Sequence, residues 1–431
     1  MLRHLDSHAL GRELYDRVER LYPLCRSITG NGVRDTLALI GREIDVAITE
    51  VPTGTQVFDW TVPQEWNIRD AYIKDGDGRR IVDFGASNLH VLSYSVPVHQ
   101  RIRLAELQPH LFSIPDRPDW IPYKTSYYSS NWGFCLTERQ RQALRDDDYE
   151  VRIDASLEDG HMTLGQCLLP GRSPDEVLFS CHICHPSLCN DNLSGVTVAV
   201  GLAKLLAQQP HRYTYRFLFI PGTIGAITWL ALNEAAVARI KHGLVLSCLG
   251  DRGKVTYKKS RQGNAEIDRA TALTLATSGD EHELRDFTPY GYDERQYCSP
   301  GFNLPVGLLS RTPHGRFPEY HTSADNLEFV TPASLADSLL KCLSIIDVLE
   351  GNAAYTNRNP KCEPQLGRRG LYGSIGGYSD TGVMEEALLW VLNLSDGTHT
   401  LLDIAERSRL PFDIVRTVAS TLQQHELLSE T

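Results

Sequence analysis

A dense run of histidine, cysteine and carboxylate side chains occupies residues 181–195, CHICHPSLCNDNLSG. It joins a short apolar run at 176–180, which predicts a buried strand, to a strongly apolar helical run at 195–206. Zinc and similar divalent metals are bound by imidazole nitrogens and carboxylate oxygens that converge on one point. His185 at the strand end and Asp191 just before the helix can converge in this way. The spacing therefore predicts a metal site.

Three other interpretations of this run stay open. CHICH, residues 181–185, fits the C-x-x-C-H pattern of covalent haem attachment, but that chemistry needs an accessible, translocated segment, and this one continues a buried strand. A structural zinc site on thiolates is a second alternative, although no second C-x-x-C completes four ligands. The third is a buried turn, rich in cysteine and histidine, that binds no metal.

Three more polar loops hold candidate functional residues. Asp251 follows the apolar run 244–248 as a ligand carboxylate would, although a plain turn residue fits equally well. His321 lies in the polar loop PEYHTSADN and, taken alone, fits an ordinary surface histidine. GYDERQYC, residues 291–298, is typical of a loop that faces a substrate. A run of charged residues on the surface fits the same pattern equally well.

The elements that position these loops follow from hydrophobic periodicity. Apolar runs at 176–180, 215–220 and 244–248 predict buried strands that alternate with helices at 195–206 and 226–237. This order indicates βαβ units and a mostly parallel sheet flanked by helices, whose ligands lie beyond the carboxyl ends of the strands.

Changes in composition and hydrophobic pattern divide the chain into four parts. We expect a core from residues 1–50 and 151–350, with an inserted small β-rich domain at 51–150. Residues 351–380 have the composition of a linker or strap, and residues 381–431 look like a helical, winged-helix-like domain.

Composition excludes some classes of protein. The chain has 431 residues and a net charge of −11, so it has no overall attraction for nucleic acid or anionic lipid. No apolar run is long enough for a membrane helix, and the charged N-terminus lacks the apolar core of a signal peptide. These features predict a cytoplasmic protein whose ten cysteines are reduced.

Taken in order, the motifs resemble the zinc-dependent aminopeptidase superfamily with paired metals. The chain is most similar to a bacterial aminopeptidase-like family with a small inserted domain and a C-terminal winged helix, and the likeness extends from about residue 14 to the end. The matching stretches are WNIRDAYI, SYYSSNWGFCL, CHPSLCNDNLSG, GDRG, DERQYCSPGFNLPVG, EYHTSADN and CEPQLGRRGLYG.

The resemblance implies a function and a site. His185, Asp191, Asp251 and His321 would bind one or two zinc ions, with Asp191 as the bridge if two are present. Metal-activated water would then attack a peptide or other amide carbonyl. The implied substrates are peptides or aminoacyl amides.

One departure from the superfamily bears on activity. A general-base glutamate and a ligand glutamate are expected after the second strand, where this chain has Gly222 and Thr223. General-base help is typically worth about 10²–10⁴-fold in rate. Glu294, Glu319 and Asp325 are candidate substitutes for the base. The alternative is a weakened homologue that binds a ligand or serves in a biosynthetic pathway.

The remaining candidates concern substrate and partners. Arg295 and Tyr297 are candidate substrate contacts from the polar loop, and aromatic residues of the inserted domain could roof the cleft or form that domain's own core: Tyr123, Tyr127, Tyr128 and Trp132. Few basic residues lie in 415–427, which favours a packing or partner-binding role over DNA reading. A DNA-binding regulator is nevertheless the third hypothesis, and a homo-oligomer stays open.

Overall fold

The computed structural model describes residues 5–371 and 381–431. These residues form two compact units. The larger contains residues 5–263 and 283–340, and the smaller contains residues 264–282, 341–371 and 381–431.

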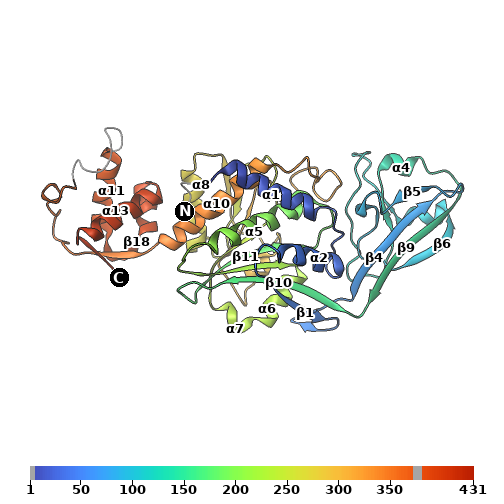
Figure 1. The fold of residues 1–431 in the computed structure, drawn as a ribbon, viewed down its shortest axis with the longest axis horizontal. Coiled ribbons are helices and arrows are strands. Elements are labelled where there is room, and N and C mark those ends of the chain that lie inside the picture. The colour runs from blue at the N-terminus through green and yellow to red at the C-terminus, as the bar shows by residue number, and fades with distance from the viewer. Residues whose placement is uncertain (1–4, 372–380) are drawn as a thin grey trace. The chain divides into compact units, whose positions relative to one another are not determined.

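An eight-stranded sheet forms the centre of the larger unit (Figure 1). Four neighbouring strands in its middle, β12, β11, β13 and β16, run parallel, and antiparallel strands flank them. Every residue of β11 and of β12 is buried, as expected for strands covered on both faces. The strand order is β1 (Ala47–Pro52), β10 (His161–Leu169), β12 (Thr214–Ile220), β11 (Glu176–His182), β13 (Ile240–Leu246), β16 (Val306–Ser310), β14 (Val255–Lys258) and β15 (His282–Arg285).

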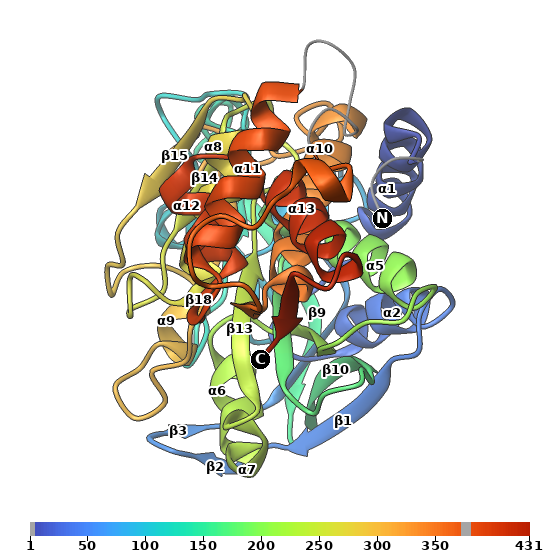
Figure 2. The same cartoon turned by 90° about the vertical axis from the view of Figure 1, so that its left-hand side faces the viewer.

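Helices cover this sheet on both faces. α5 (Gly195–Leu206) packs on the central strands with α1 (Ser7–Leu21) beside it, while α6 (Ile224–Leu232) and α7 (Glu234–Val237) lie on the opposite side (Figures 1 and 2). α2 (Asn31–Ile40) contacts β10. The predicted mostly parallel α/β fold is confirmed.

A buried ion-pair network ties α1 to the end of α2. Arg17, whose side chain is 2% exposed, donates to both carboxylate oxygens of Glu43 and to the hydroxyl of Thr197. The Arg17 hydrogen bonds hold the pKa of Glu43 at about 2, although burial acts in the opposite direction.

Glu43→Gln is expected to lower the free energy of unfolding by about 1–2 kcal/mol at pH 7, because Arg17 loses its charged acceptor. A depressed carboxyl pKa contributes stability that is full above the unfolded value of 4.5 and is lost as pH falls toward about 2. Denaturant titrations should therefore show the difference between the two proteins shrinking from pH 5 to pH 3. A constant difference over this range would contradict the assignment.

The inserted domain is built on a four-stranded antiparallel sheet in the order β5 (Arg80–Asp83), β4 (Glu65–Lys74), β9 (Asp148–Glu158) and β6 (Val98–Arg103). Its strands therefore lie between residues 65 and 158, whereas the sequence predicts an insertion at 51–150. At the start of this region β1 continues to Pro52 in the central sheet, paired with β10, and at its end β9 continues to Glu158. Short elements complete this region: β2 (Gln56–Val57), β3 (Trp60–Thr61), α3 (Leu104–Leu107), β7 (Leu111–Phe112), β8 (Phe134–Cys135) and α4 (Glu138–Gln142).

The smaller unit combines helices with a three-stranded antiparallel sheet. The sheet has the order β18 (Asp396–Thr400), β17 (Ala354–Asn357) and β19 (Leu428–Glu430), and the helices include α11 (Thr381–Leu394), α12 (Leu401–Ser408) and α13 (Phe412–Gln424). β17 lies within the stretch predicted as a linker, so the C-terminal fold begins before residue 381. Part of that stretch, residues 372–380, lies outside the described residues. α8 (Glu266–Thr277) also belongs to this unit, and the long helix α10 (Pro332–Gly351) runs into it.

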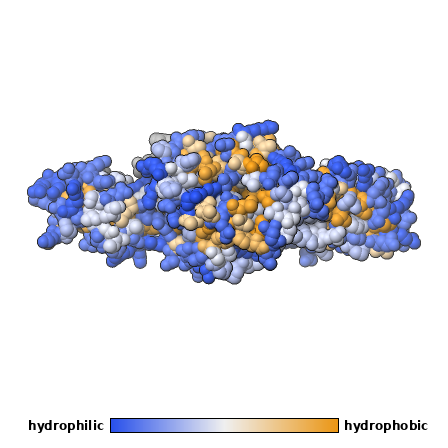
Figure 3. Space-filling view, turned by 90° about the horizontal axis from the view of Figure 1, so that it is seen from below, coloured by the Kyte–Doolittle hydropathy of each residue, from blue (hydrophilic) through white to orange (hydrophobic). Residues whose placement is uncertain are grey.

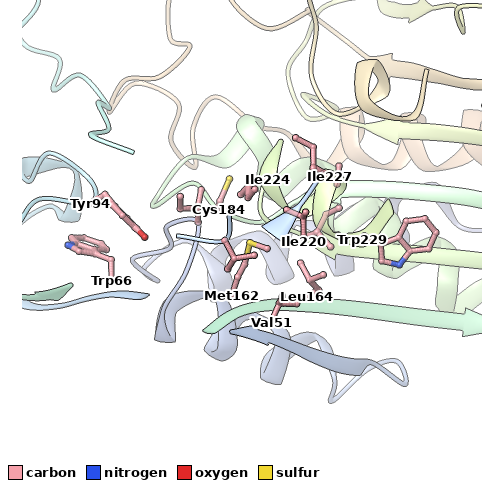
Figure 4. Packing of buried hydrophobic residues seen from close by; sticks show 14 of the residues in the cluster. Val51, Trp66, Tyr94, Met162, Leu164, Cys184, Ile220, Ile224, Ile227 and Trp229 are labelled. Atoms are coloured by element: carbon pink, nitrogen blue, oxygen red, sulfur yellow. The ribbon is translucent and has the colours of Figure 1, made fainter. Parts of the chain in front are cut away.

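The hydrophobic core of the larger unit reaches the end of β11. Cys184, just past that strand, is buried with Ile220 and Ile224 in one cluster (Figure 4). Side chains of Met162 and Leu164 from β10 fill the space beneath them. On the face seen in Figure 3, hydrophobic residues also gather on part of the surface. No described helix has the length and hydropathy needed to cross a membrane.

Candidate metal centre

Four polar side chains meet at the carboxyl end of the central strands. His182 ends β11, and His185 follows it after two residues. Asp191 lies in the turn Cys189–Ser194, which enters α5. His321 comes from the loop between β16 and α10. This is the edge at which open parallel sheets bind their ligands.

The distances between the polar atoms are short. His185 Nε2 lies 3.2 Å from His321 Nε2, and His321 Nε2 lies 3.0 Å from Asp191 Oδ2. His185 Nε2 lies 3.7 Å from the same carboxylate oxygen. The other oxygen, Oδ1, lies 2.8 Å from His182 Nε2. His182, His185 and Asp191 are all buried and together have the composition of a metal-binding group.

The spacing of three of these atoms suits a tetrahedral zinc site. Zinc lies about 2.0–2.2 Å from nitrogen and oxygen ligands, so two ligands of one tetrahedral ion are about 3.3 Å apart. The three edges between His185 Nε2, His321 Nε2 and Asp191 Oδ2 are 3.2, 3.0 and 3.7 Å. Two imidazoles and a carboxylate could therefore hold one zinc ion and leave a further position for water or substrate.

Burial sets the electrostatics of the cluster. Burial, with the neighbouring His182 and His321, holds the pKa of His185 well below 6.5, so its imidazole is neutral, as a metal ligand must be. Burial alone would raise the pKa of Asp191, but the surrounding histidines, with His182 and His321 at hydrogen-bond distance, hold it well below its ordinary value, so it stays a carboxylate. The protonation states are those that bind a cation.

The inserted domain holds His321 in place. Tyr123 N–H donates to the His321 carbonyl (2.7 Å), and Ser323 N–H donates to the Ile121 carbonyl (2.8 Å). Pro122 and Thr322 form a β-bridge between these bonds. His321 has a positive φ of 55°, which this clamp helps to maintain. The Tyr123 ring also packs at 5.1 Å from both the His185 and the His321 rings.

Asp251 is not brought to this cluster. Its Oδ1 accepts from Gly253 N and Thr312 Oγ1, and its Oδ2 accepts from Thr312 N and Asn190 Nδ2. Asp251 is 2% exposed and both of its oxygens are used. Its position fits a side chain that anchors the ligand turn through Asn190 better than a ligand.

Tyr292 occupies the space next to Gly222. A Cβ atom on residue 222 would lie 2.0 Å from the Tyr292 hydroxyl oxygen and 2.7 Å from its Cζ. The Tyr292 ring packs on His182, with centroids 3.9 Å apart. Thr223, with φ +62°, donates its N–H to Asp293, whose pKa burial raises to about 6. The glutamate pair of the superfamily is thus replaced by a phenol packed against a glycine.

Two of the three candidate substitute bases have other hydrogen-bond partners, and the third lies in the loop that carries His321. Glu294 is fully buried, pairs with Lys258 Nζ at 2.8 Å and accepts from Tyr292 N. Asp325 accepts from the N–H groups of Asn190 and Asp191, one on each oxygen, and burial raises its pKa to about 8. Glu319 is half-buried in the loop that carries His321.

Glu294→Gln is expected to destabilise the protein by about 3–5 kcal/mol, because it leaves the ammonium of Lys258 buried without its partner. Metal content and turnover per folded molecule should stay unchanged. Glu319→Gln is the matched control and should leave stability within about 0.5 kcal/mol. Loss of turnover at unchanged stability in Glu294→Gln would restore this residue as the base.

The predicted substrate contacts lie in different environments. Tyr297 is fully buried and donates to Ser180 Oγ at 2.9 Å, which leaves no surface for a substrate. Arg295 has a buried Nε. Tyr128 is 51% exposed beside Trp60, and Trp132 stacks on His110 at 3.6 Å. Tyr123, rather than these four, packs against the predicted ligands.

The thiols of the C-x-x-C-H motif are buried and have hydrogen-bond partners in the protein. Cys181 is fully buried and donates to the Leu218 carbonyl, and Cys184 accepts from Gly222 N at 3.2 Å. Burial raises the pKa of Cys181 well above its ordinary value and that of Cys184 to about 12.

Two residues of the site are missed by sequence reasoning. His182 lies three residues before His185 in the same motif, and this spacing was the available signal. Tyr292 stands within the polar run 291–298, but nothing in the sequence connects it to Gly222.

Solved structures share this architecture. The chain is 50% identical to a "putative peptidase" from Clostridium acetobutylicum, with a TM-score of 0.94 over 99% of this chain and 97% of that one. A zinc aminopeptidase from Bacillus subtilis is 14% identical, with a TM-score of 0.59 over 80% of this chain and 96% of that one. The fold is therefore that of the zinc aminopeptidases, joined to a C-terminal winged helix-turn-helix that matches residues 353–430.

Residues 15–352 match the family described as "Domain of unknown function (DUF4910)", and the chain belongs to that family. A curated relative from Clostridium acetobutylicum, 52% identical over 98% of this chain and 97% of its own length, carries the name "Putative polysaccharide biosynthesis protein with aminopeptidase-like domain".

Proposed function

We propose that this protein is a metal-dependent hydrolase of peptide or other amide bonds that binds one zinc ion through His185, Asp191 and His321. The observation that carries the proposal is the set of three donor atoms at the spacing of one zinc coordination shell. When bound, the metal would activate water and polarise the substrate carbonyl.

The side chains of the protein would bind the metal ion and shield it from water. Asp191 supplies a carboxylate that the neighbouring histidines keep ionised, and the neutral His185 supplies a nitrogen without first losing a proton. The Tyr123 ring, packed on two ligands, shields one side of the site from water. His321, with a side chain 32% exposed, is the ligand closest to solvent and marks the side of entry.

The fold and the curated relative each support a class of substrate. Aminopeptidase-like folds support a peptide or aminoacyl amide. The name of the curated relative, polysaccharide biosynthesis, adds N-acylated sugars, which carry the same amide group. The ten free cysteines support a reducing, cytoplasmic location.

Metal removal tests the proposal. Protein purified without added metal should contain about one zinc per chain by elemental analysis. A chelator should abolish turnover of a panel of aminoacyl amides and N-acylated sugars, and zinc should restore it. A protein that binds no metal would refute the proposal.

A second candidate function is a homologue that binds an amide ligand without hydrolysing it. The replacement of the glutamate by Gly222, with Tyr292 against it, favours this candidate. Stoichiometric zinc together with no turnover across the panel would support it.

The C-terminal unit is proposed to bind a partner rather than DNA. Arg416, on α13, pairs with Asp347 at 2.8 Å, and Arg269, on α8, pairs with Asp403 and Glu406. Basic groups neutralised in this way offer little to phosphates. A salt-dependent shift of DNA in a gel assay would overturn this assignment.

A further inference from the structure

A row of aromatic rings leads from the candidate metal centre to the surface. The Tyr320 ring stacks on His321, with centroids 3.9 Å apart and planes inclined by 15°. His314 follows at 6.3 Å from Tyr320, and Tyr290 at 5.8 Å from His314. We call Tyr320, His314 and Tyr290 the aromatic row. Its first member contacts a proposed zinc ligand and its last, Tyr290, is 78% exposed, so the row extends from the site to solvent.

The protein beneath the row holds both of its ends. Tyr320 packs edge-on against the buried ring of Phe317 at 5.5 Å, and Phe317 stacks on Phe329 at 5.4 Å. At the other end, the Tyr290 carbonyl accepts from Lys258 Nζ at 2.8 Å. The Lys258 side chain is only 9% exposed, so this contact ties the Tyr290 backbone to the interior. The row is therefore a preformed surface, which lowers the entropic cost of binding a ligand.

The shape and chemistry of the row indicate its ligand. The planes of Tyr320 and His314, and those of His314 and Tyr290, are each inclined by 47°, so the row is curved. A curved surface suits a puckered, saturated ring better than a flat aromatic one. Tyrosine combines an apolar face with a hydroxyl that donates and accepts hydrogen bonds. A sugar ring has the matching combination, with C–H groups on its faces and hydroxyls around its edge.

We propose that the aromatic row binds the sugar ring of an N-acylated sugar whose amide group lies at the metal centre. This inference rests on the proposed function and names its substrate class. Tyr320 contacts the part of the sugar nearest the amide, because it stacks on His321. Tyr290 contacts the part farthest from the metal. Tyr290 is therefore a specificity-determining residue that acts on binding and not on the chemical step.

Two variants of Tyr290 test this role. Tyr290→Ala removes the ring and Tyr290→Phe keeps it, and at 78% exposure neither change should affect folding or zinc content. With an N-acetylated hexosamine disaccharide, Tyr290→Ala should raise KM by about 3–10-fold, the range of one aromatic contact, at unchanged kcat. Tyr290→Phe should stay within about twofold of the wild-type protein. Phe58→Ala is the matched control, since Phe58 is a 49% exposed aromatic residue outside the row.

Two kinetic results would overturn the proposal. One is a KM for the disaccharide that does not change in Tyr290→Ala. The other is a rise in KM for aminoacyl amides that equals or exceeds the rise for the disaccharide. That result would place the ammonium group of a peptide, rather than a sugar, on the tyrosine face.

A direct binding measurement tests the row even if the wild-type protein turns over no amide. Calorimetry with the same disaccharide should show binding by the wild-type protein and an affinity about 3–10-fold lower in Tyr290→Ala. Binding without turnover would refute the hydrolase and leave the role of the row intact. Turnover of aminoacyl amides without binding of the disaccharide would overturn the role of the row and leave the proposed function intact.

Discussion

Gly222→Glu on its own is expected to leave turnover no higher than that of the wild-type protein and to destabilise the protein by about 1–3 kcal/mol. The new Cβ would lie 2.0 Å from the Tyr292 hydroxyl, and overpacking of a filled site costs about this much. The side chain therefore cannot enter the cleft unless Tyr292 moves. Denaturant unfolding and turnover of the amide panel measure both effects.

The double variant Gly222→Glu with Tyr292→Ala is expected to raise turnover by about 10²–10⁴-fold over the single glutamate variant, because the carboxylate gains room and general-base help is worth this much. Tyr292→Ala alone is the control, since it opens the space without supplying a base. If the single Gly222→Glu variant raises turnover by as much as the double variant, Tyr292 does not block the position.

Asp191→Asn is expected to abolish zinc binding at micromolar metal and, with it, turnover. It removes the charge of a carboxylate whose Oδ2 lies 3.0 Å from one predicted ligand and 3.7 Å from another. The loss should exceed the roughly 10–100-fold that an outer partner contributes. Elemental analysis and zinc titration measure it.

Asp251→Asn is the matched control for this prediction. We expect it to leave one zinc per chain and to lower stability by about 1–3 kcal/mol, because an amide cannot accept from all four donors around it. Equal loss of zinc in both variants would return Asp251 to the ligand set.

The general architecture could be predicted because buried strands and the helices between them leave strong periodic signals. Ligands of parallel sheets bind at the carboxyl ends of the strands, and this rule predicts from the sequence that His185 and Asp191 lie close together. The same rule does not distinguish Asp251, because a carboxylate after a strand accepts hydrogen bonds in a turn as readily as it binds a metal. His321 depended on the family resemblance, since nothing local marks it.

The rest depends on contacts between distant segments. The approach of Tyr292 to Gly222 joins residues seventy positions apart and leaves no local pattern. No local pattern marks the end of the inserted domain, because β9 and β10 follow each other after only a short turn and pair in different sheets. The hydrogen bond from the Asn192 amide to the Leu246 carbonyl also joins segments that are far apart in the sequence.

The β-bridge between Pro122 and Thr322 couples the local stability of the inserted domain to metal binding at the centre. A ligand that binds only the folded state stabilises whatever must be folded to bind it, by RT ln(1 + [L]/Kd). Since His321 is clamped by the inserted domain, any zinc held there also suppresses the local opening of residues 121–123. The rate of amide hydrogen exchange at residues 121–123 would therefore fall as the free zinc concentration rises. The local stability of the inserted domain would depend on how much zinc is available.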